Sequence, residues 1–459
     1  MKITSYGAAR EVTGTKHLLD INGFRVLLDC GLFQGVRADS DRKNRNMGFD
    51  PAQLNAVVLS HAHIDHSGLL PVLCKRGFRG TIYTTAATRD LCAIMLVDSA
   101  HIQKRDAEWL TKKQMAFVPP LYEEEDVQEV MRRFVCVSYD MRVPLGPDIF
   151  ITFRDAGHVL GSAMVDLEYV EAGKPRRFLF TGDMGRKSTP ILNDPWTPTP
   201  VNVAMMESTY GNRDHGPMAS LDEKLASVIN ETHARGGKVV IPSFALERAQ
   251  EVIFALKRLE SSGAIPALPV YVDSPMTVNI TEVFRLHTEC FDPEFAALMR
   301  GAGEPFDLKR IRYIRNLEES MALNHLTESA IIISASGMCE YGRIVHHLRN
   351  TVEDPKNTIV IVGFQAQNTL GRRLVEKQRE VRILGVKREL RARVRTLDEF
   401  SAHAGRSELL DYGARLAASA EKLILVHGED EALNALKSGL EERGVRNVSI
   451  QEPGVPVEV

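Results

Sequence analysis

The sequence predicts a mixed α/β fold of two units, with the second unit inserted into the first. Short strands dominate residues 1–206, β-branched strands alternating with helices follow from about residue 211, and short strands return after about 378. Many short strands with few helices indicate two sheets packed face to face, whereas strand–helix alternation indicates a parallel sheet covered on both faces. We therefore expect a first domain at 1–210, an inserted α/β domain at 211–378 and the remainder of the first domain at 379–459.

Length and composition restrict the class of protein. The chain has 459 residues, 44% hydrophobic and 25% charged, which is too long for one core and ordinary for a globular protein. Its net charge of −3 excludes a global positive field, so a polyanion would be held by a local basic patch or by bound metal.

The distribution of cysteines and the hydropathy of the chain indicate the cellular compartment of the protein. The six cysteines are scattered without a CxxC pair, as expected for reduced thiols in the cytoplasm. The first residues lack the apolar core of a signal peptide, and we find no apolar run of about 18 residues. We therefore expect a cytoplasmic protein without a membrane span.

The elements of the first unit follow from short-range signals. Strands at 17–21 and 24–29 flank Asn22-Gly23, a strong hairpin signal. Residues 88–100 begin a helix, and a further helix begins at the acidic run 123–126, where negative charge suits the helix dipole. Further strands are expected near 80–85, 134–137, 149–153, 163–167, 177–180, 201–206 and 422–426.

The inserted unit is predicted from strands near 238–242, 269–272, 330–334 and 358–362, each separated from the next by a helical segment. These runs are short, continuous and rich in β-branched residues, which is typical of strands buried on both faces.

One polar turn carries the strongest chemical signal. The stretch from Ser60 to Gly68 follows the apolar run 56–59 and contains three histidines and an aspartate. Imidazole and carboxylate are the ligands that zinc and similar metals prefer. His61 and His63 can converge on one ion while Asp65 and His66 face a second, so the stretch predicts a two-metal hydrolytic site.

Further polar turns lie at the ends of later strands. They carry His158, Asp183, His403 and His427, each next to a glycine or in a glycine-containing turn. A lone histidine at a strand end is more often an ordinary polar side chain than a ligand. Together with the His61 stretch, however, these turns supply the roughly seven ligands that a two-metal centre requires.

On these residues the chain resembles the metallo-β-lactamase superfamily, and within it the β-CASP nucleases, the group of the cleavage-and-polyadenylation endonuclease. The matching positions are Asp29, the His61–His66 stretch, His158, Asp183, Glu207 after a strand, His403 in Phe-Ser-Ala-His and His427 in Val-His-Gly-Glu. The resemblance covers essentially the whole chain. It implies an αββα sandwich, discontinuous in sequence, with an inserted parallel-sheet β-CASP domain.

The resemblance also implies roles for these residues. One zinc would be held by His61, His63 and His158, and a second by Asp65, His66 and His427, with Asp183 bridging the two. Asp65 also counts as a catalytic residue, and Asp29 would support the ligands from behind. A metal-bridging hydroxide would hydrolyse a phosphodiester of single-stranded RNA, with His403 as general acid oriented by Glu207.

Two loops of the inserted domain are candidates for contact with the RNA backbone. One contains Ser336 and Gly337 and is followed by Arg343, whose guanidinium could clamp a phosphate. The other ends in Arg248. Helix capping and a surface arginine are the ordinary alternative explanation for both loops.

Three functions remain to be weighed. The first is a zinc-dependent ribonuclease, an endonuclease with 5′-3′ exonuclease activity left open. The second is a hydrolase of a small ester, thioester or lactam on the same metal core, and the third is a non-catalytic RNA-binding member. The phosphate-type loops and the Glu207–His403 pair favour the first. DNA cleavage, a homodimer, and manganese or iron in place of zinc stay open.

Overall fold

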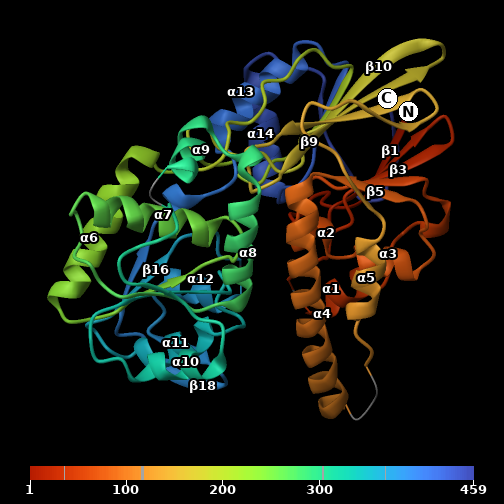
Figure 1. The fold of residues 1–459 in the computed structure, drawn as a ribbon. Coiled ribbons are helices and arrows are strands. Elements are labelled where there is room, and N and C mark those ends of the chain that lie inside the picture. Colours follow the sequence, from red (N-terminus) through yellow and green to blue (C-terminus); the bar gives the residue numbers. More distant parts are fainter. Residues whose placement is uncertain (36, 115–117, 302–303, 367) are drawn as a thin grey trace. The chain divides into compact units, whose positions relative to one another are not determined.

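The computed structural model describes residues 1–35, 37–114, 118–301, 304–366 and 368–459 (Figure 1). They form two compact units. The first unit comprises Met1–Lys187, Asn193–Asp214 and His403–Val459, and the second comprises Ser188–Leu192 and His215–Ala402. None of the helices in the described ranges combines the length and apolar character that a bilayer span requires.

Two sheets form the body of the first unit. The first sheet has the order β22-β1-β2-β3-β4-β5-β6 and the second β21-β20-β11-β10-β9-β8-β7. The strands of the first are β1 (Lys2–Gly7), β2 (Lys16–Ile21), β3 (Phe24–Leu28), β4 (Ala56–Val58), β5 (Thr81–Thr84), β6 (Phe134–Cys136) and β22 (Val457–Glu458). Those of the second are β7 (Val143–Gly146), β8 (Ile149–Asp155), β9 (Ala163–Glu171), β10 (Lys174–Phe180), β11 (Val203–Met206), β20 (Lys422–Leu425) and β21 (Val448–Ile450).

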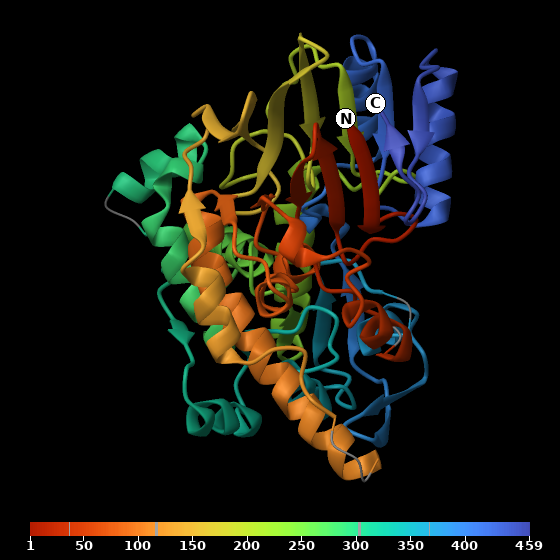
Figure 2. The same ribbon diagram turned by 90° about the vertical axis from the view of Figure 1, so that its right-hand side faces the viewer.

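Apolar side chains from both sheets meet in one buried layer. Val26 and Val58 of the first sheet share a core with Phe153 and Val165 of the second. Helices cover the outer faces: α13 and α14 pack on the second sheet, while α4 contacts β6 of the first and packs against α5. Figure 2 shows the red N-terminal strands side by side and the orange α4 as one long rod. The helices are α1 (Arg37–Asn44), α2 (Ile64–Ser67), α3 (Leu70–Lys75), α4 (Ala86–Gln114), α5 (Glu124–Met131), α13 (Arg406–Ala417) and α14 (Asp430–Glu442).

Local signals in the sequence explain several of these elements. Asn22 and Gly23 both have positive φ, at 53° and 85°, as the tight β2–β3 hairpin requires. Helix α5 begins at the acidic run, where Glu123 and Asp126 form a capping box. The expected strands and hairpin are therefore confirmed, as is the sandwich of two sheets with helices outside.

The second unit is a parallel sheet of order β14-β13-β15-β12-β16-β19, with a separate β17–β18 hairpin. Its strands are β12 (Val239–Pro242), β13 (Val270–Val272), β14 (Ile311–Tyr313), β15 (Ile331–Ser334), β16 (Thr358–Ile361), β17 (Glu380–Ile383), β18 (Val386–Glu389) and β19 (Arg393–Thr396). Its helices are α6 (Leu221–Ala234), α7 (Arg248–Ser261), α8 (Pro275–Leu286), α9 (Pro293–Arg300), α10 (Leu317–Ala322), α11 (Ile344–Thr351) and α12 (Leu370–Val375). The predicted insertion of a parallel-sheet unit is confirmed.

The boundary between the units differs from the expected position at 378. Residues 379–402 group with the second unit, because β19 pairs in parallel with β16 and the hairpin residue Val381 packs into the core of α11 and α12. Their short strands look like a return to the first unit in sequence. In space, β19 extends the inserted sheet, and β17 and β18 form a separate hairpin within the same unit.

Candidate metal centre

The polar turns predicted as ligands lie together at one edge of the first unit. Asp29 follows β3 and the His61–His66 stretch follows β4 in the first sheet, while His158, Asp183 and His427 follow β8, β10 and β20 in the second. The two facing sheets therefore deliver ligands from opposite sides to a common edge. Glu207, after β11, and His403, before α13, belong to the same unit.

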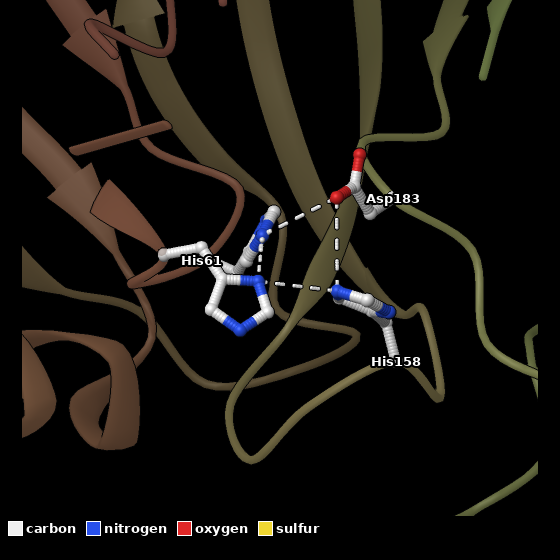
Figure 3. Close-up of side chains that lie close together, drawn as sticks. His61, His158 and Asp183 are labelled. Atoms are coloured by element: carbon white, nitrogen blue, oxygen red, sulfur yellow. Dashed lines mark hydrogen bonds and ion pairs between the residues drawn. The ribbon is translucent and has the colours of Figure 1, made fainter. Parts of the chain in front are cut away.

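The first group of side chains consists of His61, His63, His158 and Asp183, whose ligand atoms all lie within 4.8 Å of one another. His61 Nε2 is 3.1 Å and His158 Nε2 is 3.3 Å from His63 Nδ1. Figure 3 shows His61, His158 and Asp183 pointing toward one another, with Asp183 Oδ2 3.6 Å from each imidazole Nε2.

The second group consists of Asp65, His66 and His427. His66 Nε2 and His427 Nε2 are 3.2 Å apart, and Asp65 Oδ2 is 3.8 Å from His427 Nε2. Asp183 touches this group as well, because its Oδ2 is 3.3 Å from His66 Nε2 and its Oδ1 is 3.5 Å from His427 Nδ1. Asp183 is thus the carboxylate common to both groups.

The donor set fits bound metal. Ring nitrogens of buried histidines face one another at 3.1–3.3 Å, an arrangement that a shared cation stabilises. Asp183 is 2% exposed, and its Oδ1 is a buried oxygen without a hydrogen-bond donor among the described residues. A buried carboxylate oxygen in that position costs free energy unless a cation or donor satisfies it.

Charge in the centre follows from burial and from the carboxylates. Burial lowers the pKa of His61 well below its ordinary value and that of His63 to about 4, so both imidazoles are neutral, as metal ligands must be. Burial also opposes charge on His66, but Asp183 and Asp29 outweigh it and raise the pKa of His66. Burial would raise the pKa of Asp183, yet His427 and His66 hold it well below its ordinary value.

Asp29 lies behind the ligands. Its Oδ1 accepts from Ser60 N at 2.7 Å, and its Oδ2 accepts from Ser60 Oγ at 2.8 Å and from His66 Nδ1 at 2.7 Å. The bond to Nδ1 fixes the tautomer that turns His66 Nε2 toward the centre. Ser60 Oγ, 3.0 Å from His61 Nδ1, extends the same control to His61.

Replacing Asp29 by asparagine should weaken zinc binding about 10- to 100-fold, because an amide nitrogen cannot accept the hydrogen bonds that one oxygen accepts now. Competition against a zinc-chelating dye measures this affinity. Asp411→Asn, on the exposed side of α13, is the matched control and should leave the affinity unchanged. Equal affinities for the wild type and the Asp29 variant would remove Asp29 from the centre.

His403 and Glu207 form a pair beside the metal-ligand groups. Glu207 is fully buried, and its Oε1 accepts from His403 Nδ1 at 3.2 Å and from Met184 N at 2.6 Å. The His403 ring centroid lies 4.4 Å from that of His158. Burial opposes charge on His403, but Glu207 outweighs it and raises the pKa of His403. His403 is 21% exposed and Asp65 24%, so these two side chains border the solvent.

Sequence reasoning missed Glu408, which supports the turn that carries His403. Its Oε2 accepts from Gly405 N and its Oε1 from Lys187 N, each at 2.9 Å, while Ala404 N donates to Met184 O at 2.8 Å. These bonds tie the His403 turn to the loop that follows Asp183. Because Gly405 before the helix has no side chain, the sequence lacks a full capping box, and the glutamate at the third helical position is its one signal.

In the second unit, the residues predicted to bind substrate each have a partner within the protein. Arg248 is 6% exposed, forms an ion pair with Glu251, and lies 5.8 Å from the centre of the Phe400 ring. Ser336 is 7% exposed, and its hydroxyl donates to Tyr341 O. Gly337 is buried, and its carbonyl accepts from Gln365 Nε2 at 2.9 Å.

Arg343 is also occupied. Its Nη1 donates to Asp273 Oδ1 at 2.7 Å, and its Nη2 donates to Arg315 O at 2.8 Å. Asp273 is fully buried and accepts from His347 Nε2 and from Ser320 Oγ, each at 2.6 Å. The guanidinium therefore belongs to a buried network under the loop.

Three family models match the chain: a metallo-beta-lactamase superfamily domain over residues 18–173, a Beta-Casp domain over 249–374, and a Zn-dependent metallo-hydrolase RNA specificity domain over 387–450. Ribonuclease TTHA0252 of Thermus thermophilus is 38% identical over 459 residues, which is 100% of both chains. Transcription termination factor FttA of Pyrococcus abyssi is 33% identical over 478 residues, 98% of this chain and 70% of that protein.

Among solved structures, a protein of unknown function from Enterococcus faecalis is similar with a TM-score of 0.56 and 13% identity, over 99% of both chains. At that identity the likeness concerns the fold alone. It shows that the two chains share a fold over nearly their whole length.

Proposed function

We propose that this chain, which belongs to the β-CASP family of the metallo-β-lactamase superfamily, is a zinc-dependent ribonuclease that hydrolyses phosphodiester bonds of single-stranded RNA. The observation that carries the proposal is that His403 and Glu207 are hydrogen-bonded to each other beside two His/Asp ligand groups, close enough to Asp183 that the three could themselves hold an ion. The relative from Thermus thermophilus, identical at 38% of positions, is named a ribonuclease.

The residues that would hold the metals divide as the two groups do. His61, His63 and His158 would bind one zinc, and Asp65, His66 and His427 the other, with Asp183 shared between them. When bound, zinc supplies a Lewis acid for the phosphodiester oxygens and lowers the pKa of a coordinated water toward neutrality.

The side chains of the pair would supply the proton. Glu207 accepts the hydrogen of His403 Nδ1, so a protonated His403 presents its remaining N–H, on Nε2, for donation. The carboxylate of Glu207 raises the pKa of His403, which favours the protonated form that an acid requires. His403 would then donate it to the ribose oxygen that leaves phosphorus, while Met184 N holds Glu207 in position.

A hydrolase of a small ester or lactam on the same centre is the competing function. Buried Glu207 beside His403 disfavours a thioester, whose thiolate leaves without a proton, and the relative from Thermus thermophilus, named a ribonuclease, favours RNA over an ester or lactam.

RNA labelled separately at its 5′ and 3′ ends tests the proposal. We expect internal cuts, so that both the 5′-labelled and the 3′-labelled RNA give shortened labelled fragments. We also expect cleavage to be lost after chelation of the metal. Release of 5′-terminal nucleotides alone would assign a 5′-3′ exonuclease mode. Zinc-loaded protein that leaves RNA intact but hydrolyses a small ester would overturn the proposal in favour of its competitor.

A substitution of Arg343 distinguishes a structural role of this residue from a role in binding RNA phosphate. Arg343→Ala leaves the buried carboxylate of Asp273 without its cation, so we expect the free energy of unfolding to fall by about 3 kcal/mol. Urea denaturation measures it, with Arg349→Ala on the same helix as a control expected within about 0.5 kcal/mol of wild type. Unchanged stability with weakened RNA binding would instead assign Arg343 to the RNA phosphate.

A further inference from the structure

Two loops of the second unit each carry an exposed aromatic side chain. Tyr341, in the loop after β15, is 55% exposed, and Phe364, in the loop after β16, is 39% exposed. In the described part of the chain, Trp109 is the other aromatic among the exposed large apolar side chains. Single exposed apolar residues are common, but two aromatics on neighbouring loops are a more specific feature.

The two loops are bonded to each other. Gln365 Nε2 donates to Gly337 O at 2.9 Å, and Gly371 N donates to Met338 O at 3.2 Å. Leu370 N also donates to the Glu340 carboxylate. The aromatic residues are therefore presented by one connected backbone surface.

Close packing fixes this surface. A Cβ on Gly337 would lie 2.7 Å from the Phe244 ring, and one on Gly371 would lie 1.6 Å from Gln365 Oε1. Ser336 N donates to Tyr341 O at 3.2 Å, which closes the turn that carries the tyrosine. A Cβ on Gly342, whose φ is +84°, would lie 2.4 Å from Ala335 O, so the loop that carries Tyr341 admits only glycine there.

The position in the fold is one at which α/β sheets bind ligands. The chain leaves β12 toward β13 on one side of the sheet and leaves β16 toward β19 on the other. Loops at the carboxyl ends of two such adjacent strands diverge and form the usual ligand crevice. Phe364 lies in the loop after β16, and the loop with Tyr341 is bonded to it.

Two arginines follow Phe364 in sequence, at the start of the next helix. Arg372 and Arg373, on α12, line a surface pocket of about 240 Å³ together with Asn368, Glu376 and Gln378. Arg372 is paired with Glu376, whereas Arg373 donates to a backbone carbonyl, that of Asn368. Exposed aromatic rings and arginines on one binding surface are the combination that binds single-stranded nucleic acid without reading its sequence.

We propose that Tyr341 and Phe364 form a base-stacking platform for single-stranded RNA, with Arg373 contacting the adjacent phosphate. This inference rests on the proposed ribonuclease function and adds to it a binding site for the bases. Because every base has a π face, the platform binds RNA of any sequence and holds the strand by its bases as well as by its phosphates.

The test measures binding to zinc-loaded His403→Ala protein, in which the RNA stays intact, with an oligonucleotide carrying 2-aminopurine. Tyr341→Ala and Phe364→Ala should each weaken the Kd about 5- to 150-fold and reduce the quenching of 2-aminopurine. Tyr341→Phe and Phe364→Tyr keep a ring and should bind as the parent does. Trp109→Ala, on α4, is the matched exposed-aromatic control and should also leave Kd unchanged.

An abasic nucleotide supplies the second arm. An abasic nucleotide at the stacked position should weaken the binding of RNA to the parent protein. In the alanine variants, the same nucleotide should cause no further increase in Kd. Alanine variants that bind like the parent, or that weaken abasic and intact RNA equally, would overturn the platform. In an otherwise wild-type background these variants should keep hydrolysis of a small phosphodiester, which shows that they are folded. Failure of the ribonuclease proposal can be told apart from failure of the stacking platform, because in the former case the wild-type protein would leave RNA uncut.

Discussion

His403→Ala is expected to lower kcat on RNA by about 10²–10⁴-fold while the protein keeps its zinc. His403 donates Nδ1–H to Glu207 and stands beside the ligand groups, so its loss removes the proton donor without removing a ligand of the predicted set. Single-turnover cleavage of labelled RNA gives the rate, and elemental analysis of the same sample gives the zinc content.

The leaving group distinguishes an acid from other roles. From a p-nitrophenyl phosphodiester, the p-nitrophenolate departs without being protonated. The same variant should therefore lose far less activity on that substrate than on RNA. His346→Ala, an exposed histidine of α11, is the control and should leave both activities unchanged. Loss of zinc in the His403 variant would make His403 a ligand, and equal losses on both substrates would contradict its role as an acid.

Asp183→Asn is expected to abolish both zinc binding and cleavage, with a loss at least as large as that of the acid, about 10²–10⁴-fold. Among the described residues, Asp183 is the carboxylate that joins both ligand groups: Oδ2 lies 3.6 Å from His61 and His158 of the first, and Oδ2 and Oδ1 lie 3.3 and 3.5 Å from His66 and His427 of the second. Asparagine keeps the volume but removes the charge that offsets two cations. Zinc titration by calorimetry, together with RNA cleavage, measures the effect.

Asp166→Asn is a useful control for Asp183→Asn, because Asp166 is an equally buried aspartate of the same sheet that pairs with Arg177 rather than with histidines. It should cost stability and leave the zinc affinity of the folded protein unchanged. An Asp183→Asn protein that retains both zinc ions would contradict the assignment of Asp183 as the shared ligand.

Much of the centre could be predicted because its residues are chemically unusual and lie at strand ends. His61, His63, Asp65 and His66 crowd into one turn, and no structural role requires that composition. The ends of strands can also be predicted, because apolar runs such as 56–58 stop where the polar turn begins. Asp29 and Glu207, by contrast, were identified only through the resemblance to the β-CASP nucleases, because a lone carboxylate after a strand is no signal by itself.

Other residues were beyond prediction because their roles depend on long-range partners. Arg343 follows a loop that suits phosphate, but Asp273, 70 residues away, holds its guanidinium. Arg248 begins a helix and is nevertheless buried against Glu251. The segment 379–402 contains short strands like those of the first unit. Its assignment to the second unit depends on the pairing of β19 with β16. Exposure of Tyr341 and Phe364 follows from packing, which sequence patterns do not reveal.

The most direct test of the central claim is a titration of metal-free protein with zinc, followed by RNA cleavage. The arrangement of the ligand groups predicts that cleavage rises with added zinc and reaches its full rate at about two ions per chain. Full activity on RNA in protein shown by elemental analysis to be free of metal would contradict it.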